Sequence, residues 1–398
     1  MTVSRELQLT LTGKACGLEE RAPMCGVPHH AAEHYIRRLV EKGYKVAICE
    51  QLEDPAKAKG IVKRDVVRIV TPGTLTDSSM LSADVNNYLA SIHMGKEEAG
   101  LAYCDISTGE LAVSSFTVKD GFRELLDELI RLDVREALVN PQDAEKFTAE
   151  LREQSEACVT ELPENYFAAD HANRVICRHF HVRSVTGLGI DEGSSVERAL
   201  GALFSYLLET QKAGSSQLTS VRIEDHRGHC VLDQTAIRNL ELMETITDQK
   251  KEGSLVSVLD CTRTAMGSRL LKKWIREVLS DSVEINERLD AVSVLAEDFL
   301  LRNNLRDCLK NVYDLERLSG RLAQGGANAR DMIALRNSLR LLPEIRTELS
   351  LLYLYRQLLR IMIFISMPKS LTHIFSIQTV SLYLITEYGD WRQNAESI

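Results

Sequence analysis

The hydrophobic pattern of this 398-residue chain changes character twice. Residues 1–75 alternate helical and strand patterns, residues 84–118 carry short apolar runs separated by turns, and from about residue 195 amphipathic helical patterns follow one another. A single core does not extend over this length, because cores stop growing beyond roughly 250–300 residues. The sequence therefore predicts three domains and a tail, at residues 1–75, 76–192, 193–350 and 351–398.

The first domain is predicted to be a small α/β unit. Residues 29–42 place apolar side chains at helical spacing, and Gly43 can end that helix. Strands are expected at residues 45–49 and 61–70, where β-branched residues are frequent, and Pro72 ends the second one.

The second domain is predicted to hold a mixed sheet flanked by helices. Three short apolar runs indicate an antiparallel meander, and a helix and a strand follow it. These elements are expected at residues 88–92, 101–106, 110–113, 121–132 and 137–140. The glycine-rich residues 186–189 mark the expected end of the domain.

The third domain is predicted to be a mainly helical platform, because amphipathic patterns recur there with short breaks. Helices are expected at residues 196–212, 234–243, 265–278, 285–298 and 331–342, with short extended pieces at 217–233. The fold class is therefore multidomain, with two α/β units followed by an α-helical one.

The tail departs from this pattern. Residues 349–386 contain no Asp or Glu, although acids make up 57 of the 398 residues. One interpretation is a buried or membrane-seeking segment, but its Ser, Thr, His and Gln residues give little support to a bilayer span. The interpretation that we favour is that this stretch is out of frame relative to the natural continuation.

Charge and cysteine content limit the class of protein. The formal net charge is -9, yet residues 1–75 carry 12 Lys or Arg against nine Asp or Glu. Contact with nucleic acid is therefore expected to be local. The nine cysteines form no CxxC pair, and the first 30 residues show no signal-peptide pattern. We expect reduced thiols in a cytoplasmic protein, with no membrane partner.

Four motifs in the first domain resemble the bacterial MutS family of DNA mismatch-recognition proteins. They are SREL at residues 4–7, APMCGVPHHA at 22–31, GYKVAICEQ at 43–51 and VVRIVTPGT at 66–74. Each is an ordinary sequence alone, but the order and spacing are specific. The resemblance continues in the third domain with LDQTAIRNLEL at 232–242, SLVSVLDCT at 254–262, MGSRLL at 266–271 and DLER at 314–317.

The resemblance implies a mismatch-binding domain, a ribonuclease-H-like connector and an incomplete core and lever domain. In that family a Phe-x-Glu segment supplies an apolar wedge and a glutamate to the mispaired base. It would lie before Val3, where this sequence holds only Met1 and Thr2. The family as a whole binds mispaired duplex DNA as a homodimer, uses ATP and Mg²⁺, and recruits a MutL-type partner. No GxxxxGK[ST] motif occurs here, so we expect a fragment without catalytic residues, cofactor or ATPase activity.

Six residues are candidates for contact with DNA. Five basic side chains within twelve residues could face phosphates, and one methionine could lie near the groove. They are Met24, Lys57, Lys59, Lys63, Arg64 and Arg68. The alternatives are a solvated face for the basic residues and a core position for Met24. Without the wedge we expect weak, non-specific binding of duplex DNA in a nucleoid-associated protein.

Two other functions remain open. Asp105 is expected at a strand end, where ribonuclease-H-like nucleases hold a metal-binding carboxylate, but it has no clear acidic partners. Its alternative role is to cap the turn that follows. The chain could instead be a partner-binding module without repair activity of its own.

Other polar residues are expected to be structural. Arg238, Arg269 and Arg317 stand beside acids and are expected to form ion pairs. Histidines at positions such as 30 and 34 lack the further ligands that a zinc site needs, so no metal site is predicted.

Overall fold

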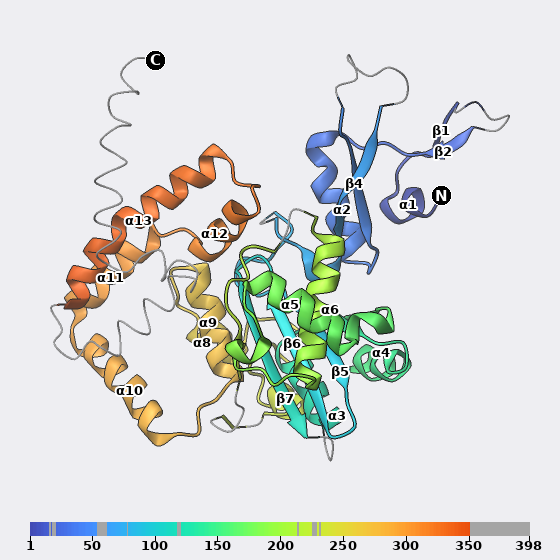
Figure 1. Cartoon of the computed structure of the whole chain (residues 1–398). Coiled ribbons are helices and arrows are strands. Elements are labelled where there is room, and N and C mark those ends of the chain that lie inside the picture. Colours follow the sequence, from blue (N-terminus) through green and yellow to red (C-terminus); the bar gives the residue numbers. More distant parts are fainter. Residues whose placement is uncertain are drawn as a thin grey trace.

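The computed structural model describes residues 1–15, 17, 21–53, 62–77, 79–117, 121–212, 215–224, 229–230 and 232–350. Figure 1 shows three regions in chain order: an N-terminal unit, a central sheet with its helices, and a C-terminal group of helices. The predicted tail at residues 351–398 lies outside the described residues.

The N-terminal unit contains the expected helix and strands. After a short helix α1 (Thr2–Leu7), strands β1 (Thr12–Lys14) and β2 (Ala22–Met24) form a hairpin that the sequence did not predict. Helix α2 (Ala32–Val40) ends before Gly43, which adopts a φ of 79°. Strands β3 (Val46–Gln51) and β4 (Arg64–Val70) pair in antiparallel fashion and form a two-stranded ribbon.

The central sheet has six strands in the order β10-β7-β6-β5-β8-β9. Their bounds are β5 (Leu89–Met94), β6 (Glu98–Asp105), β7 (Glu110–Thr117), β8 (Glu136–Val139), β9 (Cys158–Glu161) and β10 (Arg222–Ile223). The first three form the predicted antiparallel meander, whereas β8, β9 and β10 pair in parallel with their neighbours. The sheet is therefore mixed, as expected.

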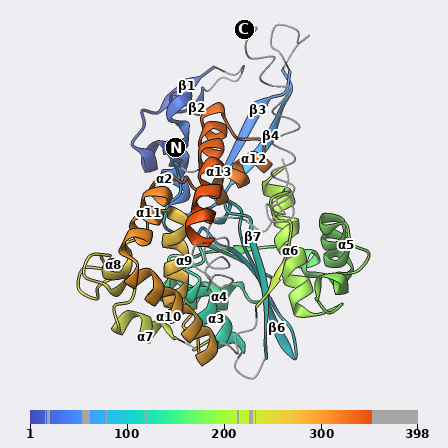
Figure 2. The same cartoon turned by 90° about the vertical axis from the view of Figure 1, so that its left-hand side faces the viewer.

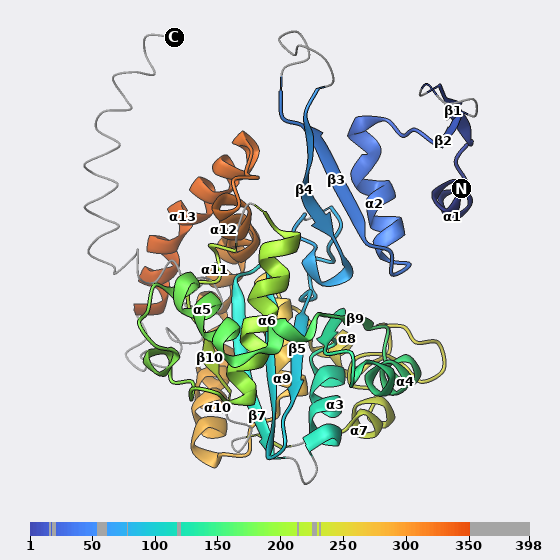
Figure 3. The same cartoon turned by 45° about the vertical axis from the view of Figure 1, so that its right-hand side comes forward.

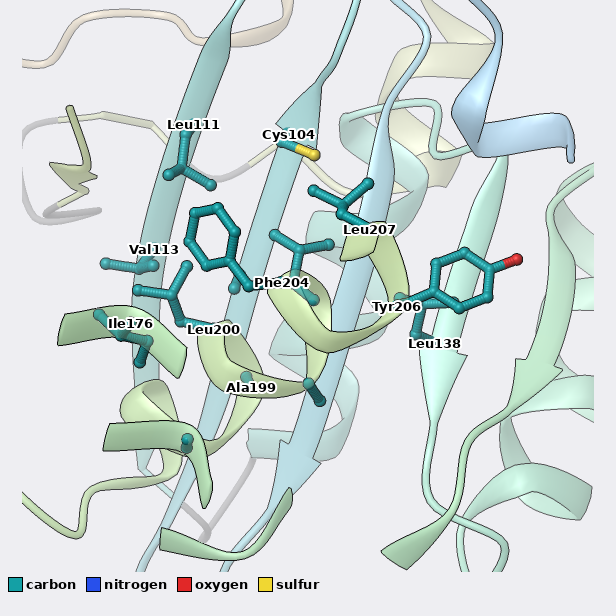
Figure 4. Packing of buried hydrophobic residues seen from close by; sticks show 14 of the residues in the cluster. Cys104, Leu111, Val113, Leu138, Ile176, Ala199, Leu200, Phe204, Tyr206 and Leu207 are labelled. Carbon is teal, nitrogen blue, oxygen red and sulfur yellow. The ribbon is translucent and has the colours of Figure 1, made fainter. Parts of the chain in front are cut away.

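One face of the sheet is covered by α5 (Ala169–Phe180) and α6 (Ser195–Thr210). Figure 4 shows Phe204 and Leu200 of α6 pointing at Leu111 and Val113 of the sheet. Figure 3 shows α6 lying across the strands. The unit built on the sheet therefore includes α6 and β10, which the predicted boundary at residue 192 assigned to the helical domain.

The opposite face is covered by α3 (Gly121–Arg131) and α4 (Ala144–Gln154). Leu125 and Leu129 of α3 pack with Phe147 of α4 against buried strand residues such as Tyr103. Because strands β5, β6 and β8 are buried on both faces, this unit holds the largest core of the described residues.

The C-terminal region is helical, as predicted. Its elements are α7 (Gln234–Asn239), α8 (Leu255–Leu259), α9 (Ala265–Arg276), α10 (Ser282–Glu297), α11 (Phe299–Lys310), α12 (Leu315–Ala323) and α13 (Ala329–Ser350). All but α13 begin with an Asp, Ser or Thr side chain that accepts a backbone N–H, which explains where they start. Figure 2 shows this group on the side of strands β6 and β7 away from α5 and α6.

No helix among the described residues is both long and apolar enough to cross a bilayer.

Candidate nucleic-acid interface

The ribbon β3–β4 and the hairpin β1–β2 project from the same end of the molecule, away from the central sheet (Figures 1 and 3). All residues of β1 and β2 are exposed, and so are most residues of β3. The small core formed by Val40, Val70, Leu75 and Met80 packs against Val46 and Ile48 of the ribbon. The two antiparallel pairs of strands at this end are therefore accessible to a partner.

Two of the candidate cations lie exposed on the ribbon. Lys63 precedes β4 and Arg64 begins it, opposite Gln51 of β3. Lys57 and Lys59 lie outside the described residues, between the two strands of the ribbon. Positive charge at the end of a projecting ribbon suits contact with phosphates.

Arg68 does not share the exposed face of Arg64. In a regular strand, residues four apart point to the same side, but β4 has an irregular register in which Ile48 pairs with Arg68 and Cys49 with Val66. The extra residue turns Arg68 inward, where it is half-buried and its Nη2 donates to the Thr74 carbonyl oxygen at 3.4 Å. Burial lowers the pKa of this guanidinium.

Met24 lies at the end of β2, opposite Thr12, and 45% of its surface is exposed. The alternative of a core position for Met24 is therefore wrong. An exposed, flexible apolar side chain on a hairpin can contact an apolar surface of a partner. Lys14 and Arg21, which sequence reasoning missed, lie exposed on the same hairpin and add positive charge there.

Glu136 fastens this projecting end to the central sheet. Its buried carboxylate accepts hydrogen bonds from the Thr71 hydroxyl and the Gly73 N–H (3.0 Å), both directly after the ribbon. It also accepts from the Thr160 hydroxyl of β9 and the Tyr206 hydroxyl of α6, both at 2.7 Å. A buried carboxylate shared by three segments fixes the base of the ribbon relative to the sheet. No local sequence pattern indicates this role.

The helical region is joined to the sheet unit by arginines, as the sequence predicted for Arg269. This side chain is buried and donates to Asp314 at 2.7 and 2.9 Å and to Glu316 at 2.6 Å. It also donates to the Ala83 carbonyl oxygen at 2.8 Å. The ion pairs are structural.

Arg317 forms a second join. Its guanidinium donates to the carbonyl oxygens of Ser82 and Val85 at 2.8 and 2.7 Å. On the same helix, a Cβ added at Gly320 would lie 2.4 Å from the Ser107 carbonyl oxygen, so only glycine permits this approach. Arg238, in contrast, is exposed and has no ion pair among the residues that the structure describes.

Asp105 caps a turn. Its carboxylate is fully buried and accepts from the Asn87 N–H at 3.0 Å, the Ser107 N–H at 2.8 Å and the Ser107 hydroxyl at 2.7 Å. Burial raises its pKa, although these hydrogen bonds oppose the shift. A carboxylate with this many protein donors has little capacity left for metal ions, which argues against the nuclease alternative.

The histidines do not gather into a metal site. His30 and His34 are exposed, and His179 lies 2.7 Å from the Leu218 carbonyl oxygen through its Nε2. Within the described part of the chain, no group of three His, Cys, Asp or Glu residues is arranged to hold a metal ion.

Comparisons with known proteins agree with this architecture. Models of three MutS domains match the chain in order: domain I at residues 1–79, domain II at 87–222 and domain III at 235–380. The match to domain II includes α6 and reaches β10.

Curated relatives named DNA mismatch repair protein MutS are similar over most of the chain. The protein of Alkaliphilus oremlandii is 45% identical over 87% of this chain and 40% of its own length. Those of Alkaliphilus metalliredigens and Ruminiclostridium cellulolyticum are 47% and 46% identical over 86% and 87% of this chain. This chain spans about two fifths of the length of these relatives. With domains I, II and III matched in order, it belongs to the MutS family.

Proposed function

We propose that this chain takes part in the recognition of mismatched DNA in mismatch repair, and that its projecting N-terminal end supplies the contact with the duplex. The observation that carries this proposal is the exposed position of Lys63 and Arg64 on the ribbon and of Met24 on the hairpin, at the same end of the molecule. The names of its relatives support the process.

The proposed contact is electrostatic and independent of base sequence. Lys63 and Arg64 meet backbone phosphates and release counterions, so affinity falls steeply with salt. A mispaired step would be selected because it bends and unstacks at lower cost than a paired one. That selection needs an apolar wedge between the bases. We therefore expect the contacts of Lys63 and Arg64 by themselves to give weak binding that does not distinguish mispairs.

We further infer that the sheet unit is the ribonuclease-H-like connector of the family and recruits a MutL-type partner. Its mixed sheet, with helices on both faces, supports the assignment of the fold. Homodimer formation and an ATP- and Mg²⁺-dependent cycle belong to the proposed activity of a full-length protein. Capture of a purified MutL-type protein by this chain would support recruitment, and the absence of capture would count against it.

The binding proposal is tested by fluorescence anisotropy with two duplexes that differ only in one G·T mispair. We expect equal, weak affinities that fall with added salt, with a slope that reports the number of phosphates neutralised. A clear preference for the G·T duplex would show that the chain distinguishes mispairs without the wedge. It would overturn the proposal that the ribbon contacts phosphates only and that the wedge selects the mispair.

A further inference from the structure

A second charged site lies far from the ribbon, between the sheet unit and the helical region. A cavity of about 650 Å³ opens there between the turn after β6, the end of α3, strand β10 and helices α9 and α10. We call it the junction cavity. Its volume falls within the range of pockets that hold small organic ligands, which is roughly 300–1,000 Å³.

The lining of the junction cavity is cationic. It contains eight Lys or Arg side chains and five Asp or Glu side chains. The acids are largely neutralised by these cations: Glu110 lies 2.9 Å from Arg222 and 3.0 Å from Lys273, and Glu277 lies 2.7 Å from Arg131. Further cations of the lining pair with acids just outside it, namely Glu128, Glu224, Asp260 and Asp314. Six of the eight cations therefore have an ion pair among the described residues.

Two arginines of the lining have no ion pair among the described residues. Arg276, at the end of α9, forms no hydrogen bond or ion pair with any residue that the structure describes. Burial lowers its pKa, Asp133 opposes the shift, and the positive charge of Arg131 adds to it. Arg288 of α10 has no described ion pair either, and its guanidinium lies over the Trp274 ring at 3.9 Å.

A third donor lacks a partner. The Nε–H of Arg222 is buried at the cavity without an acceptor among the described residues, although the Nη2 of the same side chain is paired with Glu110 and Glu224. Leaving a buried donor unsatisfied costs about 1–3 kcal/mol. An anion in the cavity would supply acceptors to this donor and charge to both arginines.

We propose that the junction cavity binds a small phosphate-bearing anion, held by the guanidinium groups of Arg276 and Arg288 beside Trp274. A guanidinium presents a planar pair of donors that matches phosphate oxygens, and a multiply charged anion matches more than one uncompensated cation. Because the lining comes from both the sheet unit and the helical region, the bound anion bridges them. The site is independent of the proposed contact with DNA at the ribbon.

The test uses the full chain with Trp391→Phe, which leaves Trp274 as the only tryptophan. Inorganic pyrophosphate is titrated at constant ionic strength while Trp274 emission and binding heat are recorded. We expect saturable binding and a higher melting temperature. The double variant Arg276→Gln plus Arg288→Gln should weaken binding about tenfold or more, since it removes two charge-assisted contacts.

The matched control is Arg174→Gln plus Arg178→Gln, which removes two exposed charges from α5. It should keep the affinity for pyrophosphate. Arg288→Lys keeps the charge but not the planar donors, and it should weaken binding even if the double variant does not fold. Equal affinity in that variant and the control, an equal response to acetate, or the absence of saturable binding would overturn the proposal. So would displacement of pyrophosphate by a short DNA duplex, which would assign the cavity to a nucleic-acid backbone.

Discussion

The N-terminal unit and the central sheet unit differ in how far their strands are buried. The sheet unit buries strands β5, β6 and β8 between two layers of helices. The N-terminal unit has a core cluster of four buried apolar residues and leaves β1 and β2 wholly exposed. A rigid unit that carries an exposed ribbon suits a protein that must meet a deformable partner, because the ribbon can adjust while its base is held.

The largest expected effect sharpens this contrast in packing. Phe204 of α6 is 1% exposed, and its ring lies 4.1 Å from that of His179. Phe204→Ala should lower the free energy of unfolding of the sheet unit by about 3–5 kcal/mol, since it leaves a cavity in a close-packed core. Urea denaturation measures the loss. Val40→Ala, in the smaller core of the N-terminal unit, should cost less, and an equal loss would contradict the contrast.

A second prediction concerns the contact through which Glu136 holds the N-terminal unit to the sheet unit. Glu136→Ala leaves the Thr71 and Tyr206 hydroxyls without their buried acceptor, and Lys45, 3.8 Å away, without its partner. We expect a loss of about 3 kcal/mol in the free energy of unfolding.

Limited proteolysis measures where that loss acts. Cleavage in the variant should accelerate first between residues 71 and 88, where the chain passes from the ribbon to the sheet. Glu136→Gln keeps the shape and some acceptor capacity, so it should lose less. Unchanged proteolysis in both variants would show that the join does not depend on this carboxylate.

A third prediction concerns pH at the other join, between the sheet unit and the helical region. Burial raises the pKa of Glu110, but Lys273 and Arg222 outweigh it and hold that pKa at about 2, below the ordinary 4.5. The stabilisation is therefore complete above pH 4.5 and is lost as pH falls toward 2. It amounts to about 2 kcal/mol after allowance for partial exposure.

The measurement is the free energy of unfolding of the natural chain and of Glu110→Gln at several pH values. The variant should be less stable at neutral pH, and the difference between the two should shrink as pH falls from 4.5 to 2. A difference that is constant over this range would show that the ionised carboxylate does not stabilise the join.

The smallest expected effect belongs to the surface of the N-terminal unit. Arg37 and Glu41 form an ion pair of 2.7 Å one turn apart on the exposed end of α2. Glu41→Gln should change the free energy of unfolding by less than about 0.5 kcal/mol, because exposed pairs are screened by solvent. Thermal unfolding in low and high salt checks this, and a loss as large as that of Glu136→Ala would contradict the account.

Much of this fold follows from local sequence patterns. The meander of the sheet and helices α7, α9, α10 and α13 of the C-terminal region were predicted because alternation and helical periodicity are local signals. The placement of α6 on the sheet was not predicted, because an apolar helix has the same sequence pattern whether it covers a sheet or packs in a helical bundle. Helices α4, α5, α8, α11 and α12 were missed, as was strand β9.

The candidate interface was predicted less completely. The basic residues were found from composition, but the register shift that separates Arg68 from Arg64 arises from pairing with β3 and has no local signal. The partners of Glu136 come from positions 71, 73, 160 and 206, so only the folded chain brings them together.

The most direct test of the central claim is to reverse charge on the ribbon. Lys63→Glu plus Arg64→Glu is compared with Arg174→Glu plus Arg178→Glu, which makes the same change in net charge on exposed positions of α5. Affinity for a matched duplex is measured by anisotropy over a range of salt concentrations. We expect the ribbon variant to lose most of its binding and to show a smaller salt slope, and the control to retain both. Equal losses of affinity in the two variants would contradict the proposal that the ribbon contacts DNA.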